Sequence, residues 1–475
     1  MSDIALTAEW VARAMVGTLV SGEPARELGA VSIDTRTLAA GDLFIAIRGD
    51  RFDGAAFAEA AIEAGATGVV VPRGWNRDWS IQKRSAKALA ERVIVIEVDQ
   101  TIAALQALGQ AIRRESGTKV VAITGSAGKT TTKEITAEFL ATRYRVIRNR
   151  GNFNNHIGLP LSLVELRQRP EIAVVELGMN HAGEISTLVR VAEPDVRVWT
   201  NVGEAHVGFF ASVDAIADAK AEIFEGASAS TLLVANADDA RMTARVGAFA
   251  GRVATFGIDR DADVRATDVF DRGVDGTRAR VATPRGAVNV ETRLVGRANL
   301  ANILAATAVA LEFDVPLAAI AQTAATLRPA AHRGEVVRLA GGITVIDDSY
   351  NASPTATRRA LDVLAAAQAT RRIAVLGEML ELGDGAASLH EEVGRAAARA
   401  RIDVLFAVGG TPAEALANAA VAGGLPRAGV RYFATSDEAA EAAAAILRAG
   451  DVVLVKGSRG VNTDRVVDRL KAERG

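Results

Sequence analysis

The chain has 475 residues, of which 49% are hydrophobic and 24% charged, so it is long enough for about three globular domains with sizeable cores. Its 55 lysines and arginines balance 57 aspartates and glutamates, and only 4% of its residues are aromatic, which argues against nucleic-acid binding and base-stacking platforms. Because cysteine is absent, disulfides, thiolate metal sites and a cysteine nucleophile are excluded.

The N-terminal residues lack the pattern of a secretory signal. Asp3 and Glu9 stand where a signal peptide has its basic segment, and no long apolar segment follows them. No stretch approaches the roughly 20 uncharged apolar residues of a membrane span. We therefore expect a cytoplasmic protein without membrane insertion.

The first region, residues 1–112, alternates short apolar runs with helical patterns, which predicts a small α/β domain. A tryptophan-containing segment near its end reads as an irregular surface loop. We expect strands at residues 43–47, 68–71 and 93–98, helices at 55–64 and 102–113, and the surface loop at 72–84.

The central region, residues 113–328, repeats the alternation of strand and helix on a larger scale. Such alternation predicts a mostly parallel sheet with helices on both faces. Residues 260–295 interrupt the rhythm and suggest a β-rich insertion or a sheet edge, and residues 299–311 read as a long buried helix. The regular strands are expected at residues 172–177, 196–202, 231–235 and 253–256.

The third region, residues 329–475, is a succession of strands that are each followed by an Ala/Glu/Arg-rich helical segment. This pattern is Rossmann-like, but no GxGxxG sequence follows the first strand, so we do not predict NAD binding. The predicted fold is therefore α/β in three domains: a small N-terminal one, a central one with a mostly parallel sheet, and a C-terminal Rossmann-like one. The C-terminal strands are expected at residues 343–347, 372–376, 404–408, 430–433 and 452–455.

The sequence KVVAITGSAGKTTTKE, residues 119–134, predicts a strand, a glycine loop and the start of a helix. Backbone N–H groups and the helix dipole favour a polyphosphate at such a place. Lys129 can reach the β- and γ-phosphates, and the Thr130 hydroxyl can ligate Mg²⁺. We expect this loop to bind ATP rather than to be a plain strand-to-helix turn. The expected ATP-binding residues here are Gly125, Ser126, Ala127, Gly128, Lys129, Thr130 and Thr131.

Further polar residues follow the strands of the central region, where open α/β sheets bind ligands. Glu176 ends an apolar run and is either a Mg²⁺ ligand or a solvated carboxylate. His206 follows the next strand and is either a metal ligand or a structural histidine. By spacing alone, Lys220 is an ordinary lysine on a helix surface. The asparagine-rich segment 151–160 is either a turn or a loop that recognises substrate.

Candidate residues in the third region cluster at its first and last strands. His332 and Arg333 precede the first strand, and an arginine from a neighbouring domain is suited to neutralise a γ-phosphate. The alternative is an inter-domain salt bridge. Lys456 and Arg459 follow the last strand and suit a carboxylate or phosphate, or form a solvated turn.

These motifs resemble the Mur ligases in order and over essentially the whole chain. The segments that carry the resemblance are TGSAGKTTTKE, GNFNNHIGLP, VVELGMNHAGEI, NVGEAHV, AKAEIFEG, GRANLANILAA, HRGE, DDSYNASP, LGEMLELGDGAASLH and VKGSRG. DDSYNA, LGEMLELG and KGSRG are similar to the branch that adds D-alanyl-D-alanine. The sequence departs from the family at Ala55, where a DGH motif would place histidine, and at Ala298, where histidine often precedes the adenine-site asparagine.

The resemblance implies domains at 1–112 for the UDP-linked substrate, 113–328 for ATP and 329–475 for the ligase step. It implies two Mg²⁺ ions organised by Thr130, Glu176, His206 and Lys220, with Lys220 carrying a CO₂-derived carbamate. It places Asn299 and Asn302 near the adenine, and Arg333 and Asp348 near the γ-phosphate and ribose. The implied catalytic residues are Lys129, His206, Lys220 and Arg333. The implied substrate-binding residues are Ser32, Asp34, Thr35, Arg36, Asn155, Gly158, Tyr350, Asn351, Lys456, Ser458 and Arg459.

The implied activity is an ATP-dependent, ADP-forming ligation of D-alanyl-D-alanine to UDP-N-acetylmuramoyl-tripeptide by a monomeric enzyme of peptidoglycan synthesis. Its partners would be these small molecules, with no nucleic acid. Three alternatives remain at this stage: another Mur ligase or a folylpolyglutamate-synthase-like relative, a non-catalytic nucleotide-binding scaffold, and a P-loop kinase.

Overall fold

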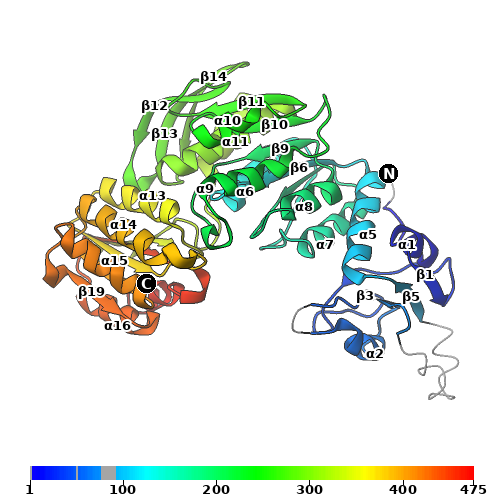
Figure 1. Ribbon diagram of the computed structural model, residues 1–475. Coiled ribbons are helices and arrows are strands. Elements are labelled where there is room, and N and C mark those ends of the chain that lie inside the picture. The colour runs from blue at the N-terminus through cyan, green and yellow to red at the C-terminus, as the bar shows by residue number, and fades with distance from the viewer. Residues whose placement is uncertain (1–2, 50–51, 76–92, 475) are drawn as a thin grey trace. The chain divides into compact units, whose positions relative to one another are not determined.

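The computed structural model describes residues 3–49, 52–75 and 93–474 (Figure 1). The chain forms two compact units. The first consists of Met1–Ala122, Tyr144–Met179 and Glu184–Asp195, and the second of Ile123–Arg143, Asn180–Gly183 and Val196–Gly475. From residue 76 on, the surface loop expected at 72–84 lies outside the described residues.

The first unit contains a five-stranded sheet in the order β1-β5-β4-β3-β2. Only β1 runs antiparallel to its neighbour. The buried strands β3, β4 and β5 confirm the three predicted ones, whereas β1 and β2 were not predicted, because both are short and half-exposed. The strands are β1 (Thr18–Ser21), β2 (Val31–Ser32), β3 (Leu43–Ile45), β4 (Gly68–Pro72) and β5 (Ile94–Val98), and the helices are α1 (Ala8–Ala14), η1 (Gly54–Phe57), α2 (Ala58–Glu63) and α5 (Thr101–Ser116).

The rest of the first unit surrounds a parallel pair of strands. β7 (Val146–Arg148) pairs with β8 (Ile172–Glu176), which is buried along its whole length. Asp195, the last residue of the first unit, forms an ion pair of 2.8 Å with Arg113 of α5. This contact fixes the end of the unit to the helix. The remaining helices are α7 (Gly158–Val164), η2 (Glu165–Gln168) and α8 (Glu184–Ala192).

The second unit opens with residues that leave β6 (Lys119–Thr124) and enter α6 (Lys129–Ala141). Strands β9 to β12 pair in parallel, and β12, β13 and β14 continue as an antiparallel edge. The β-rich segment expected at 260–295 is thereby confirmed, as is the long buried helix, α11. The bounds are β9 (Val196–Trp199), β10 (Leu232–Asn236), β11 (Arg252–Gly257), β12 (Val264–Asp271), β13 (Thr277–Thr283), β14 (Gly286–Thr292), η3 (Val207–Phe209), α9 (Val213–Ala221), η4 (Glu222–Phe224), α10 (Ala240–Val246), η5 (Gly273–Asp275), α11 (Gly296–Glu312) and α12 (Leu317–Thr326).

A six-stranded sheet in the order β15-β16-β20-β17-β18-β19 completes the second unit (Figure 1). All its pairs are parallel except β15 with β16, so the Rossmann-like pattern is confirmed. Helices α13, α14 and α15 cover one face and α16 and α17 the other. The bounds are β15 (Glu335–Leu339), η6 (Ala340–Gly342), β16 (Ile343–Asp348), α13 (Pro354–Ala366), β17 (Arg371–Gly377), η7 (Gly383–Gly385), α14 (Ala386–Arg399), β18 (Val404–Val408), α15 (Thr411–Ala422), η8 (Arg427–Gly429), β19 (Val430–Phe433), α16 (Ser436–Ile446), β20 (Asp451–Lys456), η9 (Arg459–Val461) and α17 (Asp464–Arg474).

The predicted α/β class with mostly parallel sheets is therefore correct. The central strands β17 and β20 of the last sheet are near-continuous apolar runs, because both of their faces are buried. Among the helices of the described residues, none combines the length and apolar composition that crossing a membrane requires.

His390 is a fully buried histidine that joins α14 to the loop after β17. Its Nε2 accepts the Met379 N–H at 2.9 Å, and its Nδ1 lies 2.7 Å from the Ala386 carbonyl oxygen. These two contacts define a neutral ring, with the proton on Nδ1. Burial lowers the pKa of His390, while the Ala386 carbonyl and Glu378 oppose this effect.

We predict that the protein loses stability in mild acid partly through His390. Because its folded pKa is lowered, the unfolded chain binds a proton below about pH 6.5 that the folded chain does not bind. Stability is full above that pH and declines as the pH falls toward the folded pKa. Urea unfolding of the wild type and His390→Gln at about pH 7.5 and about pH 5.5 measures the effect. The wild type should lose the larger share of its unfolding free energy, and equal losses would contradict the account.

Candidate functional site

The loop between β6 and α6 has the backbone of a phosphate-binding loop. Gly125 and Gly128 have φ values of 148° and 81°, which glycine adopts without strain. A Cβ on Gly128 would lie 2.5 Å from Oδ1 of Asn302, and one on Gly125 would collide with the Thr200 hydroxyl. α6 then begins at Lys129, so the N-terminal end of its dipole, which favours an anion, lies at the loop.

The end of β9 holds this loop in place. The Asn201 side chain binds the Ala127 backbone at both polar groups, accepting its N–H at 2.9 Å and donating to its carbonyl at 2.9 Å. The Thr200 hydroxyl donates to the same carbonyl at 2.7 Å. The sequence analysis gave neither residue a role, although Thr200 ends the run before the NVGEAHV motif and Asn201 is the first residue of that motif.

Lys129 and Thr130 project from the first turn of α6. The Lys129 ammonium donates to the Gly125 carbonyl at 2.9 Å and so lies over the loop. The Thr130 hydroxyl accepts a hydrogen bond from Arg333 at 3.4 Å. Behind them, the buried Asn302 accepts from the Thr132 hydroxyl at 3.2 Å and reaches Asn299 at 3.3 Å. Gly125, Lys129, Thr130, Asn299, Asn302 and Arg333, six of the predicted ATP-site residues, thus lie together, and Asn302 supports the loop from α11.

Lys220 is not on a helix surface, contrary to what its spacing predicts. It lies near the end of α9 and only 2% of it is exposed. Burial lowers the pKa of Lys220 well below its ordinary value, and the nearby charge of Lys129 lowers it further. The amine is therefore driven toward its neutral form.

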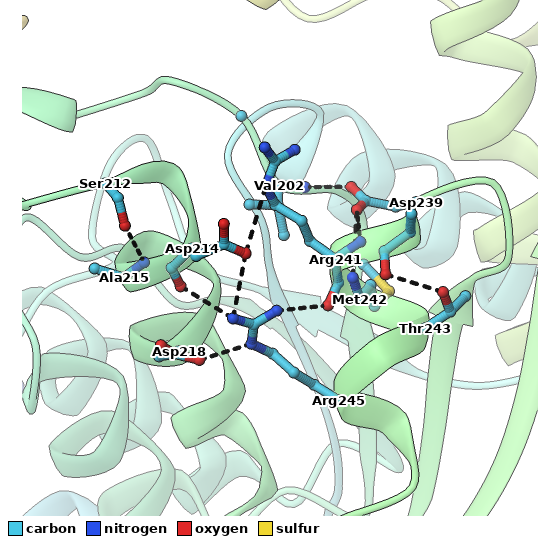
Figure 2. A network of polar contacts seen from close by, with 12 residues as sticks. Val202, Ser212, Asp214, Ala215, Asp218, Asp239, Arg241, Met242, Thr243 and Arg245 are labelled. Atoms are coloured by element: carbon cyan, nitrogen blue, oxygen red, sulfur yellow. Dashed lines mark hydrogen bonds and ion pairs between the residues drawn. The ribbon is translucent and has the colours of Figure 1, made fainter.

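An ionic network between Arg245 of α10 and two aspartates of α9 fixes these helices to each other, as Figure 2 shows. Arg245 donates to the Asp218 carboxylate at 2.7 Å and to the Asp214 carbonyl at 3.3 Å. Asp239 caps α10 and also accepts the Val202 N–H at 2.7 Å. α10 is thus linked both to the helix that carries Lys220 and to the segment that leads to His206.

His206 stands directly before η3 with a φ of 62°, in the left-handed region. Its Nδ1 lies 2.5 Å from a carboxylate oxygen of Glu381. Burial lowers the pKa of His206, Lys129 and Lys220 act in the same direction, and Glu381 opposes them. Lys129, His206 and Lys220 therefore share one positive field, and we call these three residues the basic cluster.

Arg333 lies in a turn that is held by the end of β16. Its guanidinium stacks on the Tyr350 ring, 4.0 Å from the ring centroid. The buried carboxylate of Asp347 lies 2.8 Å from Nδ1 of His332, and the Asp347 carbonyl accepts the Gly334 N–H at 2.8 Å. These contacts on both sides of Arg333 orient its side chain toward Thr130.

The last predicted motif, KGSRG, joins the ends of β16 and β20. The Lys456 ammonium donates to the Asp348 carboxylate at 2.6 Å and to the Asn351 carbonyl at 3.0 Å. The Ser458 hydroxyl accepts the Leu380 N–H at 2.9 Å, and Arg459 pairs with an aspartate of α17. Asp348, Asn351 and Lys456 are therefore brought together, whereas Ser458 is bonded to the loop after β17.

In the first unit, Glu176 and the asparagine-rich segment form a local network. The Glu176 carboxylate accepts from the Asn154 amide at 2.8 Å, and its N–H donates to Asn149 at 3.0 Å. Asn155 accepts the N–H of Gly158 at 2.8 Å and so begins α7. The turn that was one alternative for this segment is present, and a substrate role for Asn155 and Gly158 stays a prediction.

The SIDTR segment, residues 32–36, begins in β2 of the first unit. Arg36 pairs with Asp34 at 2.6 Å on the surface, and hydrogen bonds from the Arg36 side chain and backbone lower the pKa of Asp34 to about 2. The Ser32 hydroxyl donates to the Asp34 carbonyl at 3.1 Å. Asp34 is thus ionised at neutral pH and is paired with an exposed arginine near Thr35.

Three family models match successive parts of the chain. Residues 27–113 match the Mur ligase family catalytic domain, residues 123–310 the Mur ligase middle domain, and residues 332–459 the Mur ligase glutamate ligase domain. The UDP-N-acetylmuramoyl-tripeptide–D-alanyl-D-alanine ligase of Bacillus subtilis is 34% identical over 466 residues, covering 98% of each chain. The Escherichia coli ligase of the same name is 34% identical over 454 residues, covering 94% of each.

Solved structures are similar over nearly the whole chain. A crystal structure of MurF from Acinetobacter baumannii gives a TM-score of 0.88 at 30% identity and covers 99% of this chain and 100% of that one. MurF ligase from Thermotoga maritima in complex with ADP gives 0.81 at 28% identity, with coverages of 94% and 97%.

We predict that Gly128→Ala abolishes tight nucleotide binding. The added methyl group would collide with the Asn302 amide and strain a left-handed backbone, so the loop would have to open. Calorimetric titration with ADP should show at least a tenfold loss of affinity, about 1.4 kcal/mol. Gly247→Ala is the matched control, because nothing lies within 4 Å of a Cβ there. Unchanged ADP affinity in Gly128→Ala would show that the loop does not hold the nucleotide.

Proposed function

The chain belongs to the Mur ligase family, and we propose that it joins D-alanyl-D-alanine to UDP-N-acetylmuramoyl-tripeptide while ATP is converted to ADP and phosphate. Relatives that carry this activity in their names match the chain over nearly their full length at 34% identity. The observation that carries the proposal is the arrangement of Lys129, Thr130 and Arg333 around one glycine loop. The product would be the UDP-linked pentapeptide precursor of peptidoglycan.

The reaction has two steps with distinct demands. A carboxylate oxygen of the tripeptide attacks the γ-phosphorus, the bond to the ADP oxygen breaks, and an acyl phosphate forms. The amine of D-alanyl-D-alanine then attacks the acyl carbon, loses a proton, and phosphate leaves. In the first step two anions must approach each other, so cationic side chains and positioning supply much of the catalysis.

Lys129 and Arg333 are the cations that this chain offers for that step. Lys129 lies over the loop, and Arg333 is oriented by Tyr350 and by the turn that Asp347 holds. We assign both to the charge that develops on the transferring phosphoryl group. Asn299 and Asn302 are assigned to the adenine end and Asp348 to the ribose.

We further propose that Thr130, Glu176, His206 and Lys220 hold two Mg²⁺ ions. Across residues 3–49, 52–75 and 93–474, no three His, Asp or Glu side chains form a ready-made metal cluster, so other ligand types are needed. When bound, Mg²⁺ would neutralise phosphate charge. Thr130 offers a hydroxyl oxygen, whereas Lys220 fits the ligand set only if it becomes an anion.

A carbamate supplies that anion. The lowered pKa of Lys220 favours the neutral amine, whose nitrogen can attack the carbon of CO₂ and release one proton. The resulting carbamate offers oxygen ligands of the type that Mg²⁺ prefers. It also places a negative charge beside Lys129, at a position where the ammonium form of Lys220 would be repelled.

The remaining assignments rest on the resemblance alone. We propose domain boundaries near residues 112 and 328, a monomer, and a cytoplasmic location, where ATP and the UDP-linked substrate are available. The proposed substrate-binding residues are Ser32, Asp34, Thr35, Arg36, Asn155, Gly158, Tyr350, Asn351, Lys456, Ser458 and Arg459.

Phosphate release from Mg-ATP tests the activity, with UDP-N-acetylmuramoyl-tripeptide and D-alanyl-D-alanine added singly and together. Release that needs both substrates, with one dipeptide joined per phosphate, is the expected result. A stable phosphorylated product would indicate a kinase, and ligation of glutamate or a single diamino acid in place of the dipeptide would indicate another ligase. Absence of turnover with both substrates would contradict the proposal.

We predict that Lys129→Ala lowers kcat at least 10³-fold, because it removes the cation at the β- and γ-phosphates. Thermal unfolding checks that the fold is retained. Lys119→Ala is the matched control, since this lysine is exposed and pairs with Asp195 in the first unit. A Lys129→Ala enzyme with near-normal kcat would show that the loop was assigned wrongly.

We predict that Lys220→Ala is largely inactive and that short carboxylic acids partly restore it. The substitution leaves a space beside Lys129 and His206. Acetate or formate can enter this space, and its carboxylate supplies the missing anionic oxygens. Activity should rise and saturate with carboxylate concentration in the variant but not in the wild type. Full activity without any carboxylate would remove Lys220 from the metal site.

A further inference from the structure

Two loops that are far apart in the sequence meet backbone to backbone in the second unit. One is the segment with His206 before η3, and the other follows β17 and carries LGEMLELG. The Gly208 N–H donates to the Glu381 carbonyl at 3.0 Å. A Cβ on Gly208 would lie 2.5 Å from the Gly383 nitrogen, so the contact requires glycine. The two loops are therefore fitted closely to each other.

The LGEMLELG loop is itself anchored on three sides. The Met379 N–H donates to the buried His390, the Leu380 N–H to the Ser458 hydroxyl, and the Glu378 N–H to the carbonyl of Val408 in β18. Glu381 follows with a φ of 64°, a left-handed conformation that non-glycine residues adopt only where the surrounding structure holds them in it. The surrounding contacts keep Glu381 in this conformation, which directs its carboxylate to His206.

The contact between Glu381 and His206 divides the two ring nitrogens of the histidine. Nδ1 lies 2.5 Å from the carboxylate, so this nitrogen carries the proton and donates it. Nε2 has no hydrogen-bond partner among the described residues. A histidine that donates from one nitrogen to a carboxylate has the other nitrogen deprotonated and available as a metal ligand.

Resting on the proposed function of His206 as a Mg²⁺ ligand, we propose that Glu381 is the positioning residue that orients this histidine and fixes its tautomer. Glu381 belongs to the Rossmann-like part of the unit, whereas His206 belongs to the part with the glycine loop. Metal binding at His206 therefore depends on the contact between the LGEMLELG loop, residues 376–383, and η3. A carboxylate partner also makes the ring a stronger ligand than a neutral partner would.

Metal affinity measured directly, without turnover, tests this role. Mn²⁺ replaces Mg²⁺, ADP is present at saturation, and free Mn²⁺ is followed by electron paramagnetic resonance. Glu381→Gln preserves the size of the side chain and removes its charge, and Glu381→Ala removes the partner altogether. We expect about 10–100-fold weaker Mn²⁺ binding in Glu381→Ala and a smaller loss in Glu381→Gln. Asp384→Asn, an exposed change in the same loop, is the matched control and should bind Mn²⁺ normally.

His206→Ala separates failure of this inference from failure of the proposed metal site. If His206→Ala and Glu381→Ala both weaken Mn²⁺ binding and the double variant is no worse than His206→Ala, Glu381 acts through His206. If only His206→Ala weakens it, the metal site stands and the role of Glu381 is overturned. If His206→Ala has no effect, the proposed metal site itself is wrong.

A spectroscopic measurement excludes a merely structural effect. Nitrogen-15 NMR of the histidine rings distinguishes the two tautomers, and His206→Ala identifies the resonance. The wild type should show His206 protonated at Nδ1, and Glu381→Ala should shift the population toward the Nε2-protonated form. An unchanged tautomer in Glu381→Ala would overturn the proposal.

Discussion

The site is governed by the burial of the Lys220 amine beside the positive charge of Lys129. Lys220 is almost wholly inaccessible to water and lies in the field of Lys129, while His206 shares that field. An ammonium in such a place is strongly disfavoured, because burial removes its hydration and Lys129 repels it. Only a neutral amine or a nearby anion resolves the conflict. A nucleotide phosphate on the loop and a carbamate on Lys220 are the two anions that the chemistry of these residues suggests.

Much of the surrounding structure holds the basic side chains of the site at positions where they can face bound anions. Asn201 fixes the glycine loop, Arg245 fixes the helix of Lys220, and Glu381 holds the ring of His206. The contact between Arg333 and Thr130 brings the Rossmann-like part to the same loop. Because Gly208 and Gly383 leave no room for a side chain where the two loops meet, the loops lie in direct backbone contact. The site is therefore assembled from several segments, each fixed by contacts away from the phosphates.

The sequence predicted the features that depend on local pattern. Fully buried parallel strands such as β8 and β20 appear as apolar runs, and the glycine loop is recognisable from its order of residues. The half-exposed β1 and β2 have no such signal. Lys220 was read as exposed, because burial comes from packing against residues distant in the chain. The Glu381–His206 contact joins residues 175 positions apart, so neither spacing nor composition could indicate it.

The state of Lys220 is the most direct test of this account. Carbon-13 NMR of the protein in ¹³C-bicarbonate with Mg²⁺ and ADP would detect a carbamate carbon on a lysine. We predict one protein-bound resonance that disappears in Lys220→Ala and when CO₂ is removed. If the wild type binds no labelled carbon under conditions where it is fully active, the buried lysine is not neutralised in this way. The claim that a carbamate on Lys220 supplies the anion of this site would then be wrong.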